Sequence, residues 1–232
     1  MTNSKRFLDA FNQIEGLLFH DVDGGREIGF AGAVRASRNP IVRRYERDLR
    51  EYAELRNAIV HAGTGRVLAE PNDGAVEDIE HVAGLLAAPP RVDQVIRGRA
   101  VTTTRPDVSI REPVLAMLNG DFSQIPVYGD KAFIALLTAE TVSRWVGDSL
   151  QRDGGILDDT LVSDVLPHAE HDDNSSFLGP TATVFDALSL FEEFRRKGRT
   201  LDAIIVAQDA RRDVKPLNIV TIYDVPSLLK AT

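Results

Sequence analysis

The chain of 232 residues contains no cysteine. That absence excludes disulfide scaffolds, thiolate metal sites and cysteine nucleophiles, and it fits the reducing cytosol. No stretch approaches the roughly 18 consecutive apolar residues that a membrane-spanning helix needs. Residues 1–20 have neither a long apolar core nor a cleavage-site pattern, so we expect no signal peptide. These absences favour a globular protein of the cytoplasm.

The charge of the chain is unevenly distributed. The formal net charge is −8, of which −1 falls in residues 1–99 and −7 in residues 100–232. This acidity argues against a general nucleic-acid coat protein. A local basic run lies within the first half and consists of Arg35, Arg38, Arg43, Arg44, Arg47, Arg50 and Arg56. Because four carboxylates alternate with these arginines, the run could either meet phosphates or form a salt-bridged, solvated helix face.

Apolar residues recur at helical spacing through residues 1–92, which predicts an all-α domain there. The predicted helices are a first one on the stripe Phe7, Phe11, Ile14 and Leu18, a short one over Ile28–Ala36, a long one from Pro40 to His61, and a last one from about Ala75 to Ala87. Asn3 or Ser4 could cap the first helix, and Pro89 stops the last. A small bundle of this kind gains stability from dimerisation, so we expect a homodimer.

The hexapeptide Arg56-Asn57-Ala58-Ile59-Val60-His61 closes the predicted long helix. Asn57 and His61 are four positions apart and share one helix face, which the long side chain of Arg56 can also reach. RNA carries its own nucleophile, the 2′-hydroxyl, so a histidine for proton transfer and an arginine for phosphate charge would suffice for cleavage without a metal. The alternative is structural, because a histidine at a helix C-terminus is also a favourable dipole partner.

This hexapeptide resembles the signature of the HEPN (higher eukaryotes and prokaryotes nucleotide-binding) ribonuclease superfamily. The resemblance implies a metal-independent endoribonuclease that leaves a 2′,3′-cyclic phosphate. Arg56 would stabilise the phosphate, Asn57 would position it, and His61 would be the acid and base. It also implies that two copies of the motif face each other across a homodimer. Many HEPN-like domains are instead non-catalytic scaffolds or dimerisation units.

The pattern after residue 92 predicts a β-α-β-β-α unit that is used twice, so the fold class is α+β, an all-α bundle followed by two such motifs. The first motif covers about residues 93–150 and the second about 160–232. In the first, the predicted elements are a strand over Val101–Thr104, a helix over Ile110–Leu118, strands over Ser123–Tyr128 and Phe133–Leu137, and a helix over Thr138–Val146. In the second, they are a strand at Phe177-Leu178, a helix over Val184–Arg196, strands over Ala203–Ala207 and Asn218–Thr221, and a helix to Leu229.

The duplicated half resembles a tandem pair of CBS (cystathionine-β-synthase) motifs. In such motifs a Gly-h-h-Thr-x-x-Asp string, where h is apolar, ends the third strand and opens a helix. The second repeat reads Asn218-Ile219-Val220-Thr221-Ile222-Tyr223-Asp224 and keeps the threonine and the aspartate. The first reads Ala135-Leu136-Leu137-Thr138-Ala139-Glu140-Thr141 and keeps only the threonine. A helix N-terminus suits phosphate because its N–H groups and dipole favour anions.

The CBS resemblance implies an adenine nucleotide (ATP, ADP or AMP) as regulatory ligand, with no metal. In the second repeat Asp224 would hold ribose, Thr221 phosphate, and Phe177 and Leu178 the base, with Asn218 at the position of the glycine. Thr138 marks the first site, which lacks the ribose carboxylate. Structurally, Asp224 could simply cap a helix. Two functions follow as hypotheses. One is an endoribonuclease that is regulated by an adenine nucleotide and acts on RNA. The other is a nucleotide-sensing scaffold whose helical domain is non-catalytic and serves for dimerisation or partner binding.

Overall fold

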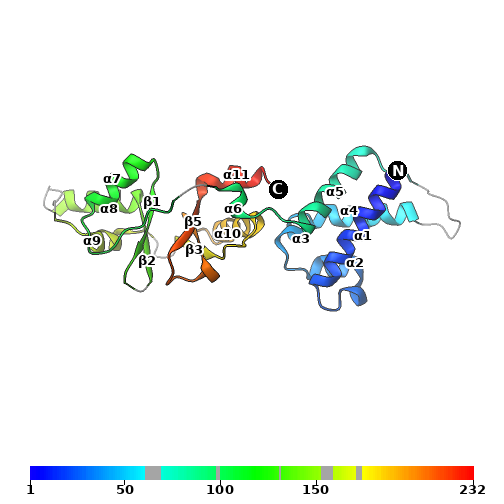
Figure 1. The fold of residues 1–232 in the computed structure, drawn as a ribbon, viewed down its shortest axis with the longest axis horizontal. Coiled ribbons are helices and arrows are strands. Elements are labelled where there is room, and N and C mark those ends of the chain that lie inside the picture. Colours follow the sequence, from blue (N-terminus) through cyan, green and yellow to red (C-terminus); the bar gives the residue numbers. More distant parts are fainter. Residues whose placement is uncertain (61–68, 98–99, 131, 153–158, 171–173) are drawn as a thin grey trace. The chain divides into compact units, whose positions relative to one another are not determined.

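The computed structural model describes residues 1–60, 69–97, 100–130, 132–152, 159–170 and 174–232. The chain mixes helices with strands and divides into two compact units, Met1–Pro90 and Arg91–Ala231 (Figure 1). Each unit has buried apolar clusters of its own. Among the helices of the described residues, none combines the length and the apolar character needed to cross a membrane.

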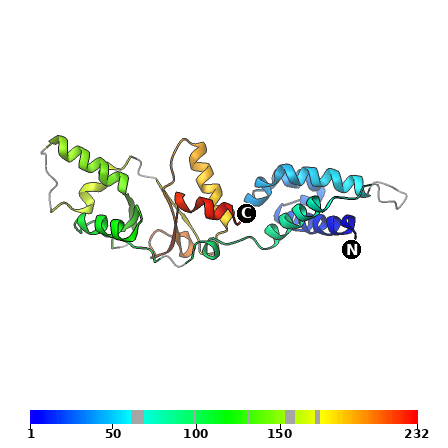
Figure 2. The same ribbon diagram turned by 90° about the horizontal axis from the view of Figure 1, so that it is seen from above.

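Within the described residues of the first unit, all the secondary-structure elements are helices. Its elements are α1 (Asn3–Asp21), α2 (Gly25–Ala36), α3 (Pro40–Arg44), α4 (Glu46–Val60) and α5 (Asp73–Ala87). The apolar stripe predicted for the first helix is confirmed, since Phe7, Phe11, Ile14 and Leu18 are all buried. Helices α1 and α5 lie side by side, as Figure 1 and, from above, Figure 2 show.

The prediction of one long helix from Pro40 was wrong at Tyr45, where the helix is interrupted. Tyr45 has φ −100° and ψ 18°, which separates α3 from α4. The hydrogen bonds nevertheless continue through it, from Tyr45 N to Ile41 O at 3.0 Å and from Leu49 N to Tyr45 O at 2.9 Å. The ring of Tyr45 packs against the buried cluster of this unit. The interruption is therefore a local distortion that keeps the apolar stripe facing inward.

The N-terminus of α1 is held by the segment that precedes α5, in a way that the sequence did not predict. Thr2, rather than Asn3 or Ser4, is the N-cap, and its hydroxyl accepts from Lys5 N. Ser4 is buried and binds Glu70, donating its N–H to Oε1 at 3.1 Å and its hydroxyl to Oε2. These two donors lower the pKa of Glu70, the hydroxyl more than the N–H. The carboxylate thus satisfies a backbone donor that a helix start leaves unpaired.

We expect Glu70→Gln to lower the melting temperature of the full chain at pH 7. A carboxyl group with a lowered folded-state pKa stabilises the fold above its ordinary pKa, and this contribution is lost as pH falls through the lowered value. The difference from the unsubstituted chain should therefore narrow below about pH 4.3, the ordinary pKa of glutamate. Thermal unfolding between pH 7 and pH 3 measures it. Glu77→Gln, at an exposed carboxylate of α5, is the matched control. An equal effect of both substitutions at pH 7 would contradict the role given to Glu70.

The second unit contains two similar motifs. The first consists of α6 (Val92–Val95), α7 (Arg111–Gly120), β1 (Gln124–Tyr128), β2 (Phe133–Thr138) and α8 (Ala139–Arg152). The second consists of α9 (Val162–Val165), η1 (Leu166–His168), β3 (Ser175–Leu178), α10 (Val184–Arg196), β4 (Ala203–Ala207), η2 (Gln208–Ala210), β5 (Pro216–Thr221), η3 (Ile222–Asp224) and α11 (Val225–Leu229). The helix predicted over Val184–Arg196 and the strand over Ala203–Ala207 are confirmed with the same bounds.

The strand registers of the two motifs correspond. Strands β1 and β2 are antiparallel with Gln124 opposite Thr138, and β4 and β5 are antiparallel with Ala203 opposite Thr221. Strand β3 lies parallel to β4. The strand predicted over Val101–Thr104 was wrong, since only a parallel bridge from Thr104 to Val127 forms in the described residues. Pro106 has no N–H to extend the pairing beyond it.

Each motif places its leading short helix in the core of the other motif. Val92 on α6 and Ile96 just after it pack with the apolar residues of α10, β4, β5 and α11. Val162 and Val165 on α9 pack with those of α7, β1, β2 and α8, including Trp145. Matching backbone bonds hold the two helices, from Val92 N to Ala182 O at 3.0 Å and from Val162 N to Val108 O at 2.9 Å. The two cores are therefore completed reciprocally.

Candidate functional site

A cavity of about 1010 Å³ lies in the second unit, where residues of both motifs meet. The first motif contributes residues 100–102, the turn from α7 into β1 at residues 120–124, and the start of α8. The second motif contributes Ile219, Thr221 and Tyr223, from the end of β5 and from η3. The lining combines apolar and aromatic side chains with hydroxyls and the carboxylate of Asp121. A cavity of this size and lining suits a small organic ligand that has an aromatic part.

Thr221 and Asp224 form a capping turn next to this cavity, which Thr221 lines and Asp224 does not. Thr221 donates its N–H to Asp224 Oδ2 at 2.8 Å and its hydroxyl to the same oxygen at 3.1 Å. Both residues are buried, and Asp224 is only 4% exposed. Thr221 lines the cavity directly. The structural role that the sequence allowed for Asp224, a cap, is therefore present.

A second Thr-x-x-Asp pair shows which part of this geometry is informative. Thr183 and Asp186 at the start of α10 make the same bonds, with Thr183 N and Oγ1 each 2.8 Å from Asp186 Oδ2. That pair is a helix cap and does not line the cavity. The bonding pattern alone is thus a capping box. The position of Thr221 on the cavity is what makes it a candidate for ligand binding.

The first motif has a similar turn made of two threonines. Thr141 donates its N–H to Thr138 Oγ1 at 3.1 Å, and the two hydroxyls are 2.9 Å apart. Both side chains are buried. Neither threonine lines the cavity. The duplicated turn therefore keeps its local hydrogen bonds but carries no carboxylate.

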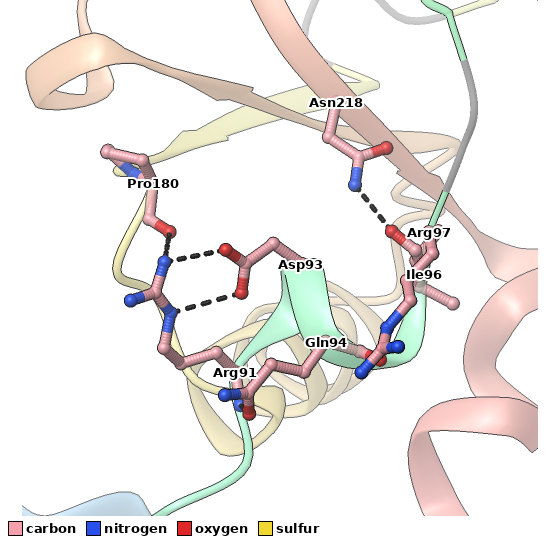
Figure 3. Close-up of polar contacts among 7 residues, drawn as sticks. All are labelled: Arg91, Asp93, Gln94, Ile96, Arg97, Pro180 and Asn218. Atoms are coloured by element: carbon pink, nitrogen blue, oxygen red, sulfur yellow. Dashed lines mark hydrogen bonds and ion pairs between the residues drawn. The ribbon is translucent and has the colours of Figure 1, made fainter.

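Asn218 stands where the CBS resemblance predicts a glycine. Its side chain connects β5 to the segment around α6 (Figure 3). Its Nδ2 donates to Ile96 O at 2.8 Å, and its Oδ1 accepts from Ile219 N at 2.8 Å. It is 9% exposed and does not line the cavity. The residue in the same register of the first motif is Ala135, which pairs with Val127 as Asn218 pairs with Val206. Alanine has no side-chain donor for an equivalent bond.

Phe177 and Leu178 do not line the cavity, so the expectation that they hold the base beside Thr221 is not supported by their position. Phe177 packs edge-to-face on Phe133 with the ring centroids 5.1 Å apart, and the guanidinium of Arg212 lies 5.3 Å from the same ring. Phe133 also contacts Tyr128. Burial raises the pKa of the Tyr128 phenol. Leu178 belongs to the apolar packing of the second motif.

Of the three candidate catalytic residues in the hexapeptide, the structure describes Arg56 and Asn57. Arg56 and Asn57 lie in the last turns of α4, where Asn57 is exposed and Arg56 half-buried. Arg56 Nη1 is 3.4 Å from Asn57 Oδ1. His61 lies outside the described residues. Within the described part of the chain, no three histidine, aspartate or glutamate side chains come together as a metal site requires.

The sequence reasoning missed the part of the cavity that comes from the first motif. Val101, Phe122 and Tyr223 line the cavity, although no motif marked them. Tyr223 offered one signal, because it lies between Thr221 and Asp224 and is a large aromatic residue that is 74% exposed. Val101 and Phe122 could be found only once the relative placement of the two motifs was known.

No protein-family model matches the chain, and no curated protein matches it. Three of the solved structures that it resembles contain CBS domains. A CBS domain-containing protein of unknown function from Kribbella flavida shares 16% identity over 60% of this chain and 97% of that chain, with a TM-score of 0.45. The CBS domain pair of MJ0100, in complex with 5′-methylthioadenosine and S-adenosyl-L-methionine, shares 13% identity over 61% of this chain and 97% of that chain, with a TM-score of 0.43. CBSX2 in complex with AMP shares 14% over 61% of this chain and 95% of that chain, with a TM-score of 0.43.

We expect Asp224→Ala to lower the free energy of unfolding by about 1 kcal/mol, the usual cost of losing a helix cap. Asp224→Asn should cost less because an amide oxygen can still accept from Thr221. Thr141→Ala, at the matching position of the first motif, should also cost less, since Thr138 Oγ1 still accepts the N–H of residue 141. Urea unfolding at pH 7 provides the measurement. The capping role would be refuted by an Asp224→Ala protein as stable as the unsubstituted one.

Proposed function

We propose that the second unit is a CBS pair that senses an adenine nucleotide or a related adenosine compound. The observation that carries the proposal is the position of Thr221 on a cavity of about 1010 Å³ that both motifs line. The duplicated order of elements, with matching registers and reciprocal helix packing, supports the CBS assignment. Structures that the chain resembles include CBS proteins in complex with AMP and with 5′-methylthioadenosine and S-adenosylmethionine.

In this proposal the ligand lies between the motifs and is contacted by both. Thr221 would meet the phosphate or the substituent in its place, and Asp224 would hold the ribose hydroxyls. The base would pack against Val101, Phe122 and Tyr223, rather than against Phe177 and Leu178. Stacking of a base on an aromatic side chain contributes on the order of 1–3 kcal/mol. Tyr223 is exposed without a ligand and would become covered on binding.

One ligand per chain is expected. The turn at Thr138 and Thr141 has the local geometry of the turn at Thr221, but it lacks the carboxylate proposed to hold ribose. Thr138 would therefore cap its helix and make no ligand contact. We further propose that two chains form a homodimer and that ligand binding alters the helical unit. Such control requires that the ligand bind two states of the protein with different affinity.

Isothermal titration calorimetry of the full chain with AMP, ADP, ATP, 5′-methylthioadenosine and S-adenosylmethionine tests the proposal. At least one compound should bind with a stoichiometry near one. Thr221→Val should weaken that binding by about 10-fold or more, equivalent to about 1.4 kcal/mol. Thr138→Val has the same chemistry in the other motif, and it should leave affinity and stoichiometry unchanged. Thermal unfolding of both variants controls for folding. If none of the five compounds binds, the nucleotide-sensing proposal is wrong.

A second function, RNA cleavage by the helical unit, rests on one observation. Arg56 and Asn57 contact each other on an accessible part of the last turns of α4, where a phosphate could reach them. In this proposal Arg56 stabilises phosphate charge, Asn57 positions it and His61 transfers protons. The alternative is that the helical unit is non-catalytic and serves as a dimerisation or partner-binding domain.

Incubation of the full chain with total RNA and a folded tRNA in EDTA, with and without AMP, tests this second function. His61→Ala should lower the cleavage rate by about 10²- to 10⁴-fold, the usual contribution of proton transfer. Arg56→Ala should also lower it, because the phosphate charge then loses its cationic partner. Arg47→Ala, at an exposed arginine of the same helix, is the control. The products should end in 2′,3′-cyclic phosphate. Intact RNA in all conditions, or equal cleavage by the His61→Ala protein, would exclude the ribonuclease.

A further inference from the structure

Asn218 joins two segments that reach the same cavity. On one side it belongs to β5, which continues to the lining residues Ile219 and Thr221. On the other side its Nδ2 binds Ile96 O, at the end of α6, and the chain returns to the cavity at Ala100. Figure 3 shows this bond beside the contacts of Arg91. A ligand in the cavity would thus contact chain segments on both sides of the Asn218–Ile96 bond.

The segment that Asn218 holds is the first part of the second unit. It begins at Arg91, directly after Pro89 and Pro90. It packs on the second motif although α6 is the leading helix of the first motif. Its far end is fixed by Arg91, which donates to Pro180 O at 3.1 Å and pairs with Asp93 at 2.6 Å. Its near end is fixed by Asn218. The two ends therefore have separate anchors, and only the Asn218 anchor adjoins the cavity.

The amide of Asn218 is suited to this connection. The residue is buried, and both ends of the amide are engaged, one by Ile96 O and the other by Ile219 N. A buried amide that loses one partner carries a desolvation penalty, so movement of either segment is opposed by the other. Ala135 in the first motif offers no such link to α9. The connection is therefore specific to α6.

We propose that Asn218 is a positioning residue that couples ligand binding in the cavity to the α6 segment, residues 91–97. This inference rests on the proposed nucleotide site and adds the route by which binding is transmitted. Ligand binding stabilises the closed arrangement in which Asn218 holds Ile96. Opening of α6 then requires that the ligand contacts at Ile219 and Thr221 loosen as well. The ligand acts on the segment that connects the second unit to the helical domain.

Hydrogen exchange of the full chain, measured by mass spectrometry with and without AMP, tests the coupling. If calorimetry finds that AMP does not bind, whichever of the five compounds binds most tightly replaces AMP as the probe. The amides of Val92 and Ile96 report on α6, since they bind Ala182 O and Val92 O. At a ligand concentration about 100 times Kd, an opening that must release the ligand is suppressed by up to about 100-fold. The unsubstituted chain should therefore exchange these amides far more slowly with AMP.

In Asn218→Ala the ratio of α6 exchange rates without and with AMP should fall toward one, while the amides of Thr221 and Asp224 stay protected by AMP. Asn218→Asp removes the donor to Ile96 O but keeps an acceptor for Ile219 N, and it should lower the α6 ratio as Asn218→Ala does. This variant replaces Asn218→Ala if the alanine variant does not fold. Arg91→Ala is the matched control for a structural role, because it loosens the far end of α6. It should speed exchange with and without AMP and leave the ratio unchanged.

The outcomes separate this inference from the function on which it rests. If AMP binds and protects Thr221 and Asp224, but the α6 ratio in Asn218→Ala equals that of the unsubstituted chain, the coupling role of Asn218 is wrong and the nucleotide site stands. If none of the five compounds gives heat or protection anywhere in the second unit, the nucleotide site is wrong and the coupling falls with it.

Discussion

The reciprocal exchange of the short helices α6 and α9 is the constraint on which the second unit depends. Val92 and Ile96 complete the apolar core of the second motif, and Val162 and Val165 complete that of the first. Neither motif can bury its own apolar surface without a helix from the other, so the pair must fold as one body. The same exchange brings the chain that follows α6 back to the place where β5 ends. The cavity arises there, lined by both motifs.

Duplication preserved the backbone arrangement of the two motifs while their chemistry diverged. The registers of β1–β2 and β4–β5 correspond, and both second strands end in a threonine that caps the following turn. The side chains differ at two points. Asp224 is replaced by Thr141 in the first motif, and Asn218 by Ala135. Capping requires only an oxygen acceptor, so both turns are stable. The proposed ribose contact needs the carboxylate of Asp224, and the link to the leading helix needs the amide of Asn218, and the first motif has neither group at these positions.

Much of the local structure could be predicted from the sequence, because apolar periodicity and turn residues act over a few positions. The stripe of Phe7, Phe11, Ile14 and Leu18, and the strand Ala203–Ala207, are examples. Local patterns gave no guidance where distant segments decide. Thr104 gains only one bridge, and Phe177 packs on Phe133 rather than on the cavity beside Thr221. Which strand borders which cavity depends on how the two motifs cross, and no local pattern records that crossing.

A ligand can control a distant segment only if its contacts differ between two arrangements of that segment. A ligand held entirely by the second motif would make the same contacts whether α6 were docked or open. Such a ligand would not shift the equilibrium between these two arrangements of α6. The cavity instead has lining residues on β5 and on the chain after α6, and Asn218 ties these two segments together. A residue without a side-chain donor could not make this link, since the bond to Ile96 O comes from the amide of Asn218.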